Sequence, residues 1–357
     1  MSDRATDDIV ALLPPLLRAL DRLAFAARYL HPGDLPAILE ACGDADLHLA
    51  AERPRLDAWP DQIAHVRTPL TTAADEALAG FQALRAAADT GGDLTAAFRA
   101  FRRLPRAEEA LFPLTRGLPP VSRFFLDGDH RDDMDLAVRL AEAPPRPDVG
   151  VLHSDAEPGG RGGFSMFVPE TYEPDRPLPL VMALHGGSGN GRAFLWSWVR
   201  AARTRGAIVV APTAIGQTWA LTGDDVDTPN LGRIVQFVRS RWAIDPRRLL
   251  LTGMSDGGTF TYVSGLEPTS PFTHLAPVSA AFHPMLASFA DPGRLSGLPI
   301  HIVHGAMDWM FPIVMAREAA RSLQNAGASV TYREVDDLSH TYAREVSASL
   351  LDWMADA

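Results

Sequence analysis

The sequence predicts an α/β fold with a mainly parallel sheet, preceded by an all-helical accessory domain. Over residues 1–143 alanine, leucine, arginine and acidic residues dominate, and apolar residues recur at the spacing of helices. Further along, short β-rich runs alternate with helical stretches, and this alternation implies parallel crossover connections. A proline-rich run separates the two patterns, and it cannot continue a helix because proline lacks the amide donor. We therefore expect a helical domain over residues 1–143, a linker over 144–148 and an α/β domain over 149–357.

The composition is that of an ordinary globular protein. Its 357 residues are 46% hydrophobic and 22% charged, which allows a sizeable core and one large domain or two ordinary ones. The formal net charge of -11 argues against a general affinity for nucleic acid or for an anionic membrane. The single cysteine, Cys42, excludes an internal disulfide framework and a multi-cysteine metal site, so we expect a buried structural thiol.

The first residues do not resemble a secretory signal. The apolar run over residues 9–17 follows several acidic residues and is broken by Pro14 and Pro15. No other stretch approaches the roughly 20 apolar residues that span a bilayer. We expect a cytoplasmic protein without membrane insertion.

The N-terminal half shows helical stripes of apolar residues. One stripe comprises Leu16, Leu20, Leu23, Ala24 and Ala27, and another comprises Ala74, Leu78, Phe81, Leu84 and Arg85. The second pattern ends near Gly91 and Gly92, and Asp93 is expected to cap the helix that follows.

The C-terminal half contains the runs expected to form the sheet. These are residues 178–184, 207–210, 249–252, 300–303 and 330–335. The glycine-rich turn over residues 159–163 is expected to join two earlier strands. We predict packing helices from three further stripes, which are Leu231, Ile234, Val235, Val238 and Trp242; Ala316, Ala319, Ala320 and Leu323; and Tyr342, Val346, Leu350 and Trp353. Thr228 and Pro229 resemble an N-cap and first-turn proline for the first of these helices.

The strongest local motif follows the run 249–252 directly. It has the pattern G-x-S-x-G and reads Gly253-Met254-Ser255-Asp256-Gly257-Gly258. In a nucleophile elbow the serine occupies a strained strand-to-helix turn, and small flanking residues let the chain turn sharply. An isolated match is as often a plain glycine-rich turn, but the position after a buried strand favours Ser255 as a nucleophile.

A second motif lies at the end of the run 178–184. It reads Leu184-His185-Gly186-Gly187-Ser188-Gly189 and fits an oxyanion-hole loop. Acyl transfer develops negative charge on a carbonyl oxygen, and each backbone amide that stabilises this charge contributes about 3 kcal/mol. We expect the amides of Gly187 and Asp256 to do so. A flexible turn is the plain alternative, and a phosphate-binding loop is disfavoured because no P-loop or dinucleotide pattern follows the strand.

A histidine base and a carboxylate must then follow the serine, in the chain order serine, acid, histidine. Asp308 lies in a loop after the run 300–303, and His340 lies between the run 330–335 and the last helix. In this hypothesis His340 takes the proton of Ser255 and Asp308 holds the imidazole in its tautomer. The rivals are His283, His301, His304, Asp336 and Asp337, of which His301 and His304 are interpreted as structural.

From about Val149 to the C-terminus the sequence resembles the α/β-hydrolase superfamily. The resemblance is closest to its esterase branch, which includes phospholipase/carboxylesterase, polyhydroxybutyrate-depolymerase-like and feruloyl-esterase-like proteins. It rests on the two motifs above together with Ile244-Asp245-Pro246-Arg247-Arg248, Gly305 with Asp308, and Ser339-His340. The resemblance implies a serine carboxylic-ester hydrolase that acts on a small-molecule ester, with no cofactor and no metal. Asp256 stands where relatives often carry an uncharged residue.

Aromatic and acidic residues near these motifs admit two interpretations. Trp219 and Trp309 are the better candidates to line an acyl pocket, with core packing as the alternative. The acidic group Asp224, Asp225 and Asp227 lacks the glycine and distal glutamate of a calcium loop, so we interpret it as a solvated, helix-capping loop.

Two other functions stay open. A related acyl-transfer reaction, such as thioester cleavage, peptide cleavage or transfer to an alcohol, uses the same residues. A non-catalytic binding or scaffold protein with a hydrolase fold belongs to a different class. We expect the helical domain either to pack over the active-site side or to mediate self-association into a homo-oligomer.

Overall fold

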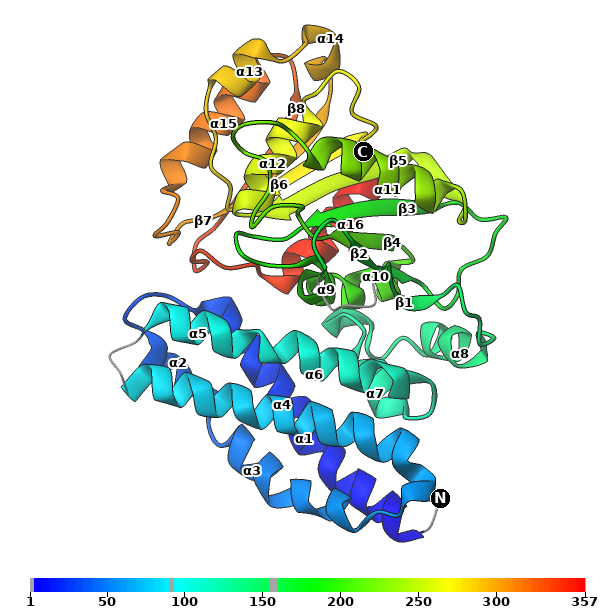
Figure 1. Ribbon diagram of the computed structural model, residues 1–357. Helices are drawn as coiled ribbons and strands as arrows, with labels where there is room; N and C mark the ends of the chain where they lie inside the picture. The colour runs from blue at the N-terminus through cyan, green and yellow to red at the C-terminus, as the bar shows by residue number, and fades with distance from the viewer. Residues whose placement is uncertain (1–2, 90–92, 155–159, 357) are drawn as a thin grey trace. The chain divides into compact units, whose positions relative to one another are not determined.

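The computed structural model describes residues 3–89, 93–154 and 160–356. Contacts divide the chain into two compact units, Met1–Ala141 and Glu142–Ala357 (Figure 1). The first unit is helical, and the second is built on one eight-stranded sheet. The change in residue pattern along the sequence thus corresponds to a change in architecture.

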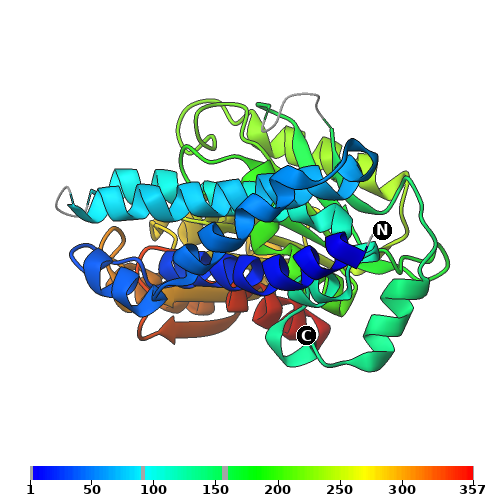
Figure 2. The same cartoon turned by 90° about the horizontal axis from the view of Figure 1, so that it is seen from below.

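Amphipathic helices build the first unit. The two longest, α1 and α4, span 27 and 26 residues and lie side by side (Figure 2). Their predicted apolar stripes face inward, since Leu16, Leu20 and Leu23 of α1 and Phe81 and Leu84 of α4 have no exposed surface. The helices are α1 (Asp3–Tyr29), α2 (Leu35–Cys42), α3 (Ala45–Glu52), α4 (Ala64–Asp89), α5 (Leu94–Phe101), α6 (Arg103–Leu111), α7 (Pro119–Phe124) and α8 (Met134–Glu142).

Helix α1 continues through Pro14 and Pro15, contrary to the expected break. A proline inside a helix costs about 3 kcal/mol because it removes a backbone hydrogen bond and crowds the preceding turn. The side chains of Leu12, Leu13 and Leu16 beside the prolines are at most 3% exposed. Burying a leucine contributes about 2 kcal/mol, so the apolar face on both sides of the prolines keeps the helix intact.

Two smaller expectations for this unit are confirmed. Oδ1 of Asp93 accepts a hydrogen bond of 2.8 Å from the amide of Thr95 and caps α5. Cys42 is a free cysteine that is 2% exposed, and burial raises the pKa of its thiol. The expected turn at Gly91 and Gly92 lies outside the described residues.

The sheet of the second unit has the strand order β1-β2-β4-β3-β5-β6-β7-β8. The first two strands pair antiparallel, and the pairs from β4 to β8 are parallel, as the alternating pattern predicts. The strands are β1 (Gly150–His153), β2 (Phe164–Val168), β3 (Leu178–Leu184), β4 (Ile208–Pro212), β5 (Ile244–Met254), β6 (His274–Val278), β7 (Pro299–Gly305) and β8 (Ser329–Val335). Gly159, the first residue of the expected glycine-rich turn over 159–163, lies outside the described residues.

Helices cover both faces of this sheet. Figure 1 shows α11 and α12 on one face and α10 and α16 on the other. The helices are α9 (Gly191–Phe194), α10 (Val199–Arg205), α11 (Asp227–Arg239), α12 (Asp256–Gly265), α13 (Met285–Phe289), α14 (Pro292–Leu295), α15 (Ile313–Asn325) and α16 (Arg344–Asp356). The inner parallel strands β3, β4 and β7 are buried along almost their whole length, which explains their continuous apolar runs, whereas the edge strand β8 is partly exposed.

Strand β6 is the element that the sequence pattern missed. It is only five residues long, and it contains Pro277, which argues against a central strand because proline cannot donate to the ladder. Every residue of β6 is nevertheless buried between β5 and β7. Tertiary burial therefore decides its conformation.

The beginning of α11 differs from the predicted cap at Thr228. The carboxylate of Asp225 accepts hydrogen bonds from the amides of Asp227 and Thr228, so Asp225 caps the helix. Asp227 is 1% exposed and accepts from the amides of Ile215 and Ala220. The interpretation of Asp227 as solvated is thus wrong, because backbone amides earlier in the same connection between β4 and α11 satisfy its carboxylate.

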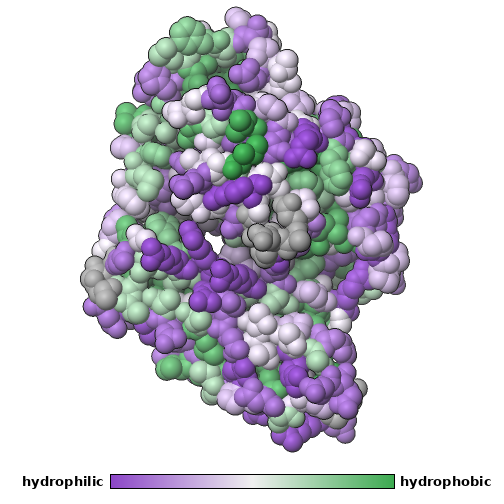
Figure 3. Space-filling view, in the orientation of Figure 1, coloured by the Kyte–Doolittle hydropathy of each residue, from purple (hydrophilic) through white to green (hydrophobic). Residues whose placement is uncertain are grey.

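The core of the second unit lies between the sheet and its helices. It includes the predicted faces of α11 and α15, with Leu231, Ile234, Ala319 and Leu323 at most 1% exposed. The surface is mixed, and in Figure 3 hydrophilic and hydrophobic residues alternate over the visible face. Among the described residues, none of the helices combines the length and the apolar character needed to cross a bilayer.

Candidate active site

Ser255 occupies the sharp turn between β5 and α12, at the carboxyl end of a central strand. Its φ of 57° lies where a side-chain-bearing residue is strained by about 1–3 kcal/mol. Two glycines permit the turn. A Cβ on Gly253 would lie 2.4 Å from the carbonyl carbon of Gly257, and a Cβ on Gly257 would lie 2.5 Å from the carbonyl oxygen of Leu184. The expected elbow is therefore present, and only glycine fits on either side of it.

Ser255, His340 and Asp308 form one chain of hydrogen bonds. Nε2 of His340 lies 3.0 Å from Oγ of Ser255, and Nδ1 of His340 lies 2.9 Å from Oδ2 of Asp308. An ionised carboxylate only accepts, so Nδ1 carries the proton and Nε2 accepts from the serine hydroxyl. All three residues are at most 7% exposed. A serine so placed can pass its proton to the imidazole as its oxygen attacks an electrophilic carbon.

The loop after β7 holds Asp308 as an ionised acceptor. Its Oδ1 accepts hydrogen bonds of 2.9 Å and 2.8 Å from the amides of Met310 and Phe311. Burial by itself raises the pKa of this carboxyl, but the hydrogen bonds from His340 and from the Phe311 amide outweigh it, and the net pKa is lowered. The carboxylate thus stays charged and fixes the imidazole of His340.

The other candidate residues lie outside this chain. Nε2 of His304 lies 2.8 Å from the carbonyl oxygen of Phe311 and 3.4 Å from Asp308, so it supports the loop rather than Ser255. His301 is 7% exposed and its ring packs against Trp353. The remaining candidates, His283, Asp336 and Asp337, are exposed.

The loop after β3 lies against the elbow. A Cβ on Gly186 would meet Met254 and Ser255, and a Cβ on Gly187 would meet the carboxylate of Asp256. The backbone amides of Gly187 and Asp256 donate no hydrogen bond within the described part of the chain. Two amide donors beside Ser255 are suited to bind a carbonyl oxygen that gains negative charge.

His185 holds this loop in place. Its Nε2 accepts a hydrogen bond of 3.1 Å from the amide of Ala214, so its Nδ1 carries the proton and donates to the carbonyl oxygen of Gly186 over 2.7 Å. Burial lowers the pKa of His185 to about 4. The ring is therefore neutral near pH 7 and orients the loop without adding charge.

Two residues that the sequence analysis named support the loop from behind, a role that the sequence pattern did not predict. Nε1 of Trp219 donates to the carbonyl oxygen of His185 over 2.7 Å, and its ring stacks on Phe260. Trp219 is 3% exposed, so its contacts are those of a packed structural residue. Asp227 binds the amides of Ile215 and Ala220 and so fixes the segment that carries Trp219. In the sequence, the position of the acidic residue Asp227 in a loop was the only sign of its contact with the amides of Ile215 and Ala220.

Aromatic residues border the imidazole of His340. The ring of Phe311 lies 5.2 Å from it edge to face, and the ring of Trp309 lies 6.2 Å from it. Trp309 is 40% exposed. It offers an apolar surface next to the reacting groups, whereas Trp219 is enclosed.

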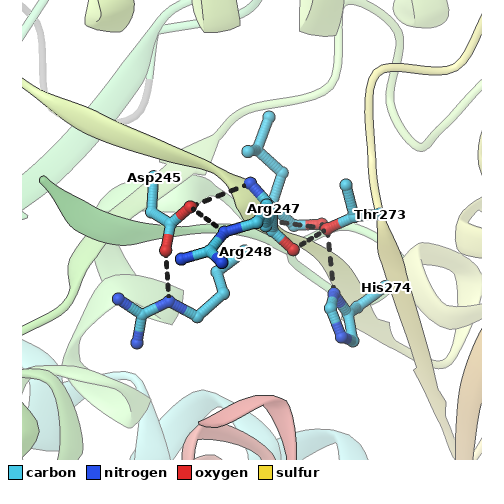
Figure 4. A network of polar contacts seen from close by, with 6 residues as sticks. Asp245, Arg247, Arg248, Thr273 and His274 are labelled. Carbon is cyan, nitrogen blue, oxygen red and sulfur yellow. Dashed lines mark hydrogen bonds and ion pairs between the residues drawn. The ribbon is translucent and has the colours of Figure 1, made fainter. Parts of the chain in front are cut away.

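A polar network fixes the opposite end of β5 (Figure 4). The carboxylate of Asp245 accepts from the amide and side chain of Arg247 and from the side chain of Arg248, and these bonds, the Arg247 amide first, lower its pKa to about 2. Oγ1 of Thr273 donates to the carbonyl of Arg247 and accepts from the amide of Leu249. The network ties the start of β5 to the start of β6 and so fixes the strand whose other end carries Ser255.

A family model agrees with this geometry. Residues 226–355 match the model of the phospholipase/carboxylesterase family. The match includes Ser255, Asp308 and His340, and the parallel sheet and elbow have the arrangement typical of one superfamily. The second unit has the α/β-hydrolase fold.

Curated and solved proteins resemble parts of the chain. A bifunctional acetylxylan esterase/xylanase of Neocallimastix patriciarum is 29% identical over 157 residues, which are 43% of this chain and 22% of that protein. Feruloyl esterase C of Emericella nidulans is 25% identical over 157 residues, 42% of this chain and 56% of that protein. A solved thermostable esterase is 22% identical with a TM-score of 0.46 over 54% of this chain and 58% of its own. The chain spans about half or less of the length of these curated relatives.

Proposed function

We propose that the α/β-hydrolase domain is a serine carboxylic-ester hydrolase that works through an acyl-enzyme. The observation that carries the proposal is the hydrogen-bonded chain from Ser255 through His340 to Asp308. The esterase activities named for the curated relatives support a carboxylic ester as the bond that is cleaved.

The proposed reaction has two halves. Oγ of Ser255 attacks the ester carbonyl while Nε2 of His340 takes its proton, and the imidazolium returns this proton to the departing alcohol. Water then attacks the acyl-enzyme with His340 again as the base, and the imidazolium returns its proton to Oγ of Ser255 as the acid leaves. Asp308 stabilises the imidazolium in both halves.

The backbone supplies the remaining stabilisation. In the proposal, the amides of Gly187 and Asp256 donate to the oxyanion of each tetrahedral intermediate, and each amide contributes about 3 kcal/mol. The exposed ring of Trp309 offers an apolar surface for the acyl group, at 6.2 Å from the ring of His340. The substrate is a small-molecule ester, and none of these steps uses a cofactor.

Hydrolysis of short-chain p-nitrophenyl esters tests the proposal. The wild type is expected to release p-nitrophenol, and Ser255→Ala is expected to abolish this release while the circular dichroism spectrum stays unchanged. Ser288→Ala, at an exposed serine of α13, is the matched control and keeps full activity. Comparison of kcat/KM for ester, thioester and amide substrates separates an esterase from the related acyl-transfer enzymes. A wild type that cleaves none of them contradicts the proposal and favours a binding or scaffold role.

For the helical unit we propose self-association of the full chain. Large apolar side chains stand exposed on three of its helices, with Val10 of α1 68%, Leu47 of α3 59% and Met134 of α8 71% exposed, and a second chain could bury them. Light scattering of the full chain is expected to give a mass above the 38.6 kDa of one chain. A mass of one chain at micromolar concentration contradicts this proposal.

A further inference from the structure

The carboxylate of Asp256 lies at the oxyanion-hole loop and has no part in the mechanism above. Asp256 follows Ser255 and is the first residue of α12. Its Oδ2 lies 2.8 Å from the position that a Cβ on Gly187 would take. The backbone amides of Asp256 and Gly187 are the two proposed oxyanion donors. The carboxylate of Asp256 therefore lies beside both donors.

One neighbour orients this carboxylate. Oγ1 of Thr218 donates a hydrogen bond of 2.6 Å to Oδ2 of Asp256. The segment that carries Thr218 is itself fixed, because Asp227 binds the amides of Ile215 and Ala220 on either side of it. Oδ2 is thus occupied, while Oδ1 has no partner within the described part of the chain.

No positive side chain neutralises Asp256. Among the described residues none of the arginines forms an ion pair with it, and the nearby ring of His185 is neutral near pH 7 because its pKa is about 4. The carboxylate of Asp256 therefore stands, without an ion-pair partner among the described residues, beside the place where the ester carbonyl gains negative charge. Like charges repel, so this arrangement slows the hydrolysis of an ester that offers nothing to the carboxylate.

A substrate with a hydrogen-bond donor reverses this effect. A hydroxyl group near the scissile carbonyl can donate a hydrogen bond to Oδ1 of Asp256. This hydrogen bond weakens the repulsion between the carboxylate and the oxyanion. A neutral donor fits better than a cation, because the N-terminus of the ten-residue helix α12 carries positive potential that already stabilises the carboxylate. The hydroxyl of Thr218, which binds the other oxygen, shows the same neutral donor chemistry.

We propose that Asp256 is a specificity-determining residue that selects esters of hydroxylated alcohols, of the polyol or sugar type. The inference rests on the proposed esterase function. In this account a hydroxyl of the alcohol part, beside the ester bond, donates to Oδ1 of Asp256. Thr218 is a positioning residue that turns Oδ1 toward the substrate.

Two esters that differ only in the alcohol test the inference. Glyceryl monobutyrate and n-propyl butyrate have the same acyl group and a three-carbon alcohol with and without free hydroxyls. In a pH-stat the wild type is expected to show at least a tenfold higher kcat/KM for the glyceryl ester. In Asp256→Asn, which keeps the backbone amide and an acceptor for Thr218, the glyceryl ester is expected to lose about tenfold and the propyl ester to gain severalfold.

Two further variants complete the design. Thr218→Val keeps the charge but frees the carboxylate to rotate, so it is expected to lower the preference through KM rather than kcat. Asp175→Asn removes an exposed carboxylate and is expected to leave both rates unchanged. Butyrylcholine, a cationic ester with the same acyl group, is the third substrate, and its rate is expected to be no higher than that of the propyl ester.

The outcomes separate the inference from the proposed function. An active wild type whose preference is the same in Asp256→Asn overturns the inference alone. Selective loss of butyrylcholine hydrolysis in Asp256→Asn also overturns it, since the carboxylate then serves a cation. A wild type that hydrolyses none of the three esters and no p-nitrophenyl ester removes the proposed function together with the inference. Labelling of Asp256→Asn by a fluorophosphonate shows that this variant is folded.

Discussion

Buried polar groups stabilise the fold in both units, but three of them in the second unit also meet beside one another. In the helical unit, buried carboxylates bind donors that hold helices together, as Asp8 does with Trp59 and Arg55. In the α/β-hydrolase domain, buried polar side chains meet one another at one edge of the sheet, where Ser255, His340 and Asp308 follow β5, β8 and β7. The first arrangement stabilises a fold, whereas the second is the basis of the proposed reaction.

Backbone strain follows the same division. Among the described residues, the non-glycine residues with positive φ are Ser188, Ser255 and Ser279, at 56°, 57° and 44°. They follow β3, β5 and β6, and none of them belongs to the helical unit. Strain of this kind persists only where the surrounding structure holds it in place, and it concentrates at functional sites. The carboxyl edge of the sheet is thus marked by geometry as well as by residue type.

The largest expected effect is on activity at this edge. Asp308→Asn keeps the shape of the side chain but offers His340 an amide in place of a carboxylate, which favours the wrong tautomer and stabilises no imidazolium. We expect kcat/KM for p-nitrophenyl esters to fall by about 10³–10⁴ with little change in the folded structure. Asp336→Asn, at an exposed carboxylate nearby in sequence, is the control and keeps wild-type kcat/KM. A loss below tenfold in Asp308→Asn would show that this carboxylate does not orient the base.

The next effect compares one glycine from each unit. A Cβ on Gly257 would lie 2.5 Å from the carbonyl oxygens of Leu184 and His185, and only a backbone shift can relieve this contact. We expect Gly257→Ala to lower the free energy of unfolding by more than about 3 kcal/mol. In α4 a Cβ on Gly80 would lie 3.2 Å from the end of the flexible Leu23 side chain.

Gly80→Ala is therefore expected to change the free energy of unfolding less than Gly257→Ala does. Alanine favours a helix by about 1 kcal/mol over glycine, which offsets the small shift of the leucine, so we expect a change within about 1 kcal/mol. Urea unfolding of both variants measures the difference. Equal destabilisation by the two substitutions would contradict the view that the elbow tolerates no side chain.

Buried histidines make the stability of the α/β-hydrolase domain depend on pH. Burial lowers the pKa of His185 and of His301 to about 4, with nearby charge on Arg161 and Arg333 adding to it. In the unfolded chain a histidine has a pKa of about 6.5. Between these values the unfolded state binds protons that the folded state does not, so the free energy of unfolding falls as the pH falls from about 6.5 to 4.

The slope of this fall measures the summed contribution of the buried histidines to the pH dependence of the free energy of unfolding. We expect about 1.4 kcal/mol per pH unit for each histidine, measured by urea unfolding at pH 7, 6 and 5. His301→Leu is expected to make the slope shallower, and His48→Leu, at an exposed position of α3, is expected to leave it unchanged. A His301→Leu protein with the wild-type slope would rule out this ring as a source of the pH dependence.

The smallest effect is expected in the helical unit. Asp8 is 5% exposed and its Oδ2 accepts a hydrogen bond of 3.0 Å from Nε1 of Trp59. Asp8→Asn keeps an acceptor but loses the charge, so we expect about 1 kcal/mol of destabilisation and an unchanged kcat/KM. A change in kcat/KM beyond twofold would show that Asp8 of the helical unit affects the reaction in the second unit.

Local patterns predicted much of the fold and of the candidate site. Three residues far apart in the sequence, Ser255, Asp308 and His340, could be placed near each other from the sequence. The elbow motif and the chain order of the three residues predicted this, because parallel strands end at one edge of a sheet. The inward faces of α11 and α15 follow from helical spacing alone.

Contacts distant in sequence escaped the same reasoning. Strand β6 is decided by burial between its neighbours despite Pro277, and α1 is kept intact across two prolines by its buried leucines. The bond from Thr218 to Asp256 joins residues 38 positions apart, and no local pattern signals it. Asp227 looked like a surface carboxylate because the sequence does not show that the connection between β4 and α11 folds back so that the amides of Ile215 and Ala220 bind it.

The central claim is that Ser255 is the nucleophile, and labelling by a fluorophosphonate tests it most directly. The reagent forms a stable bond only with an activated serine, and peptide mass spectrometry locates the modified residue. We predict one added phosphonyl group per chain, on Ser255, and no labelling in His340→Gln. Labelling at another serine, or an unmodified wild type under conditions that fully label a known serine esterase, would contradict the account.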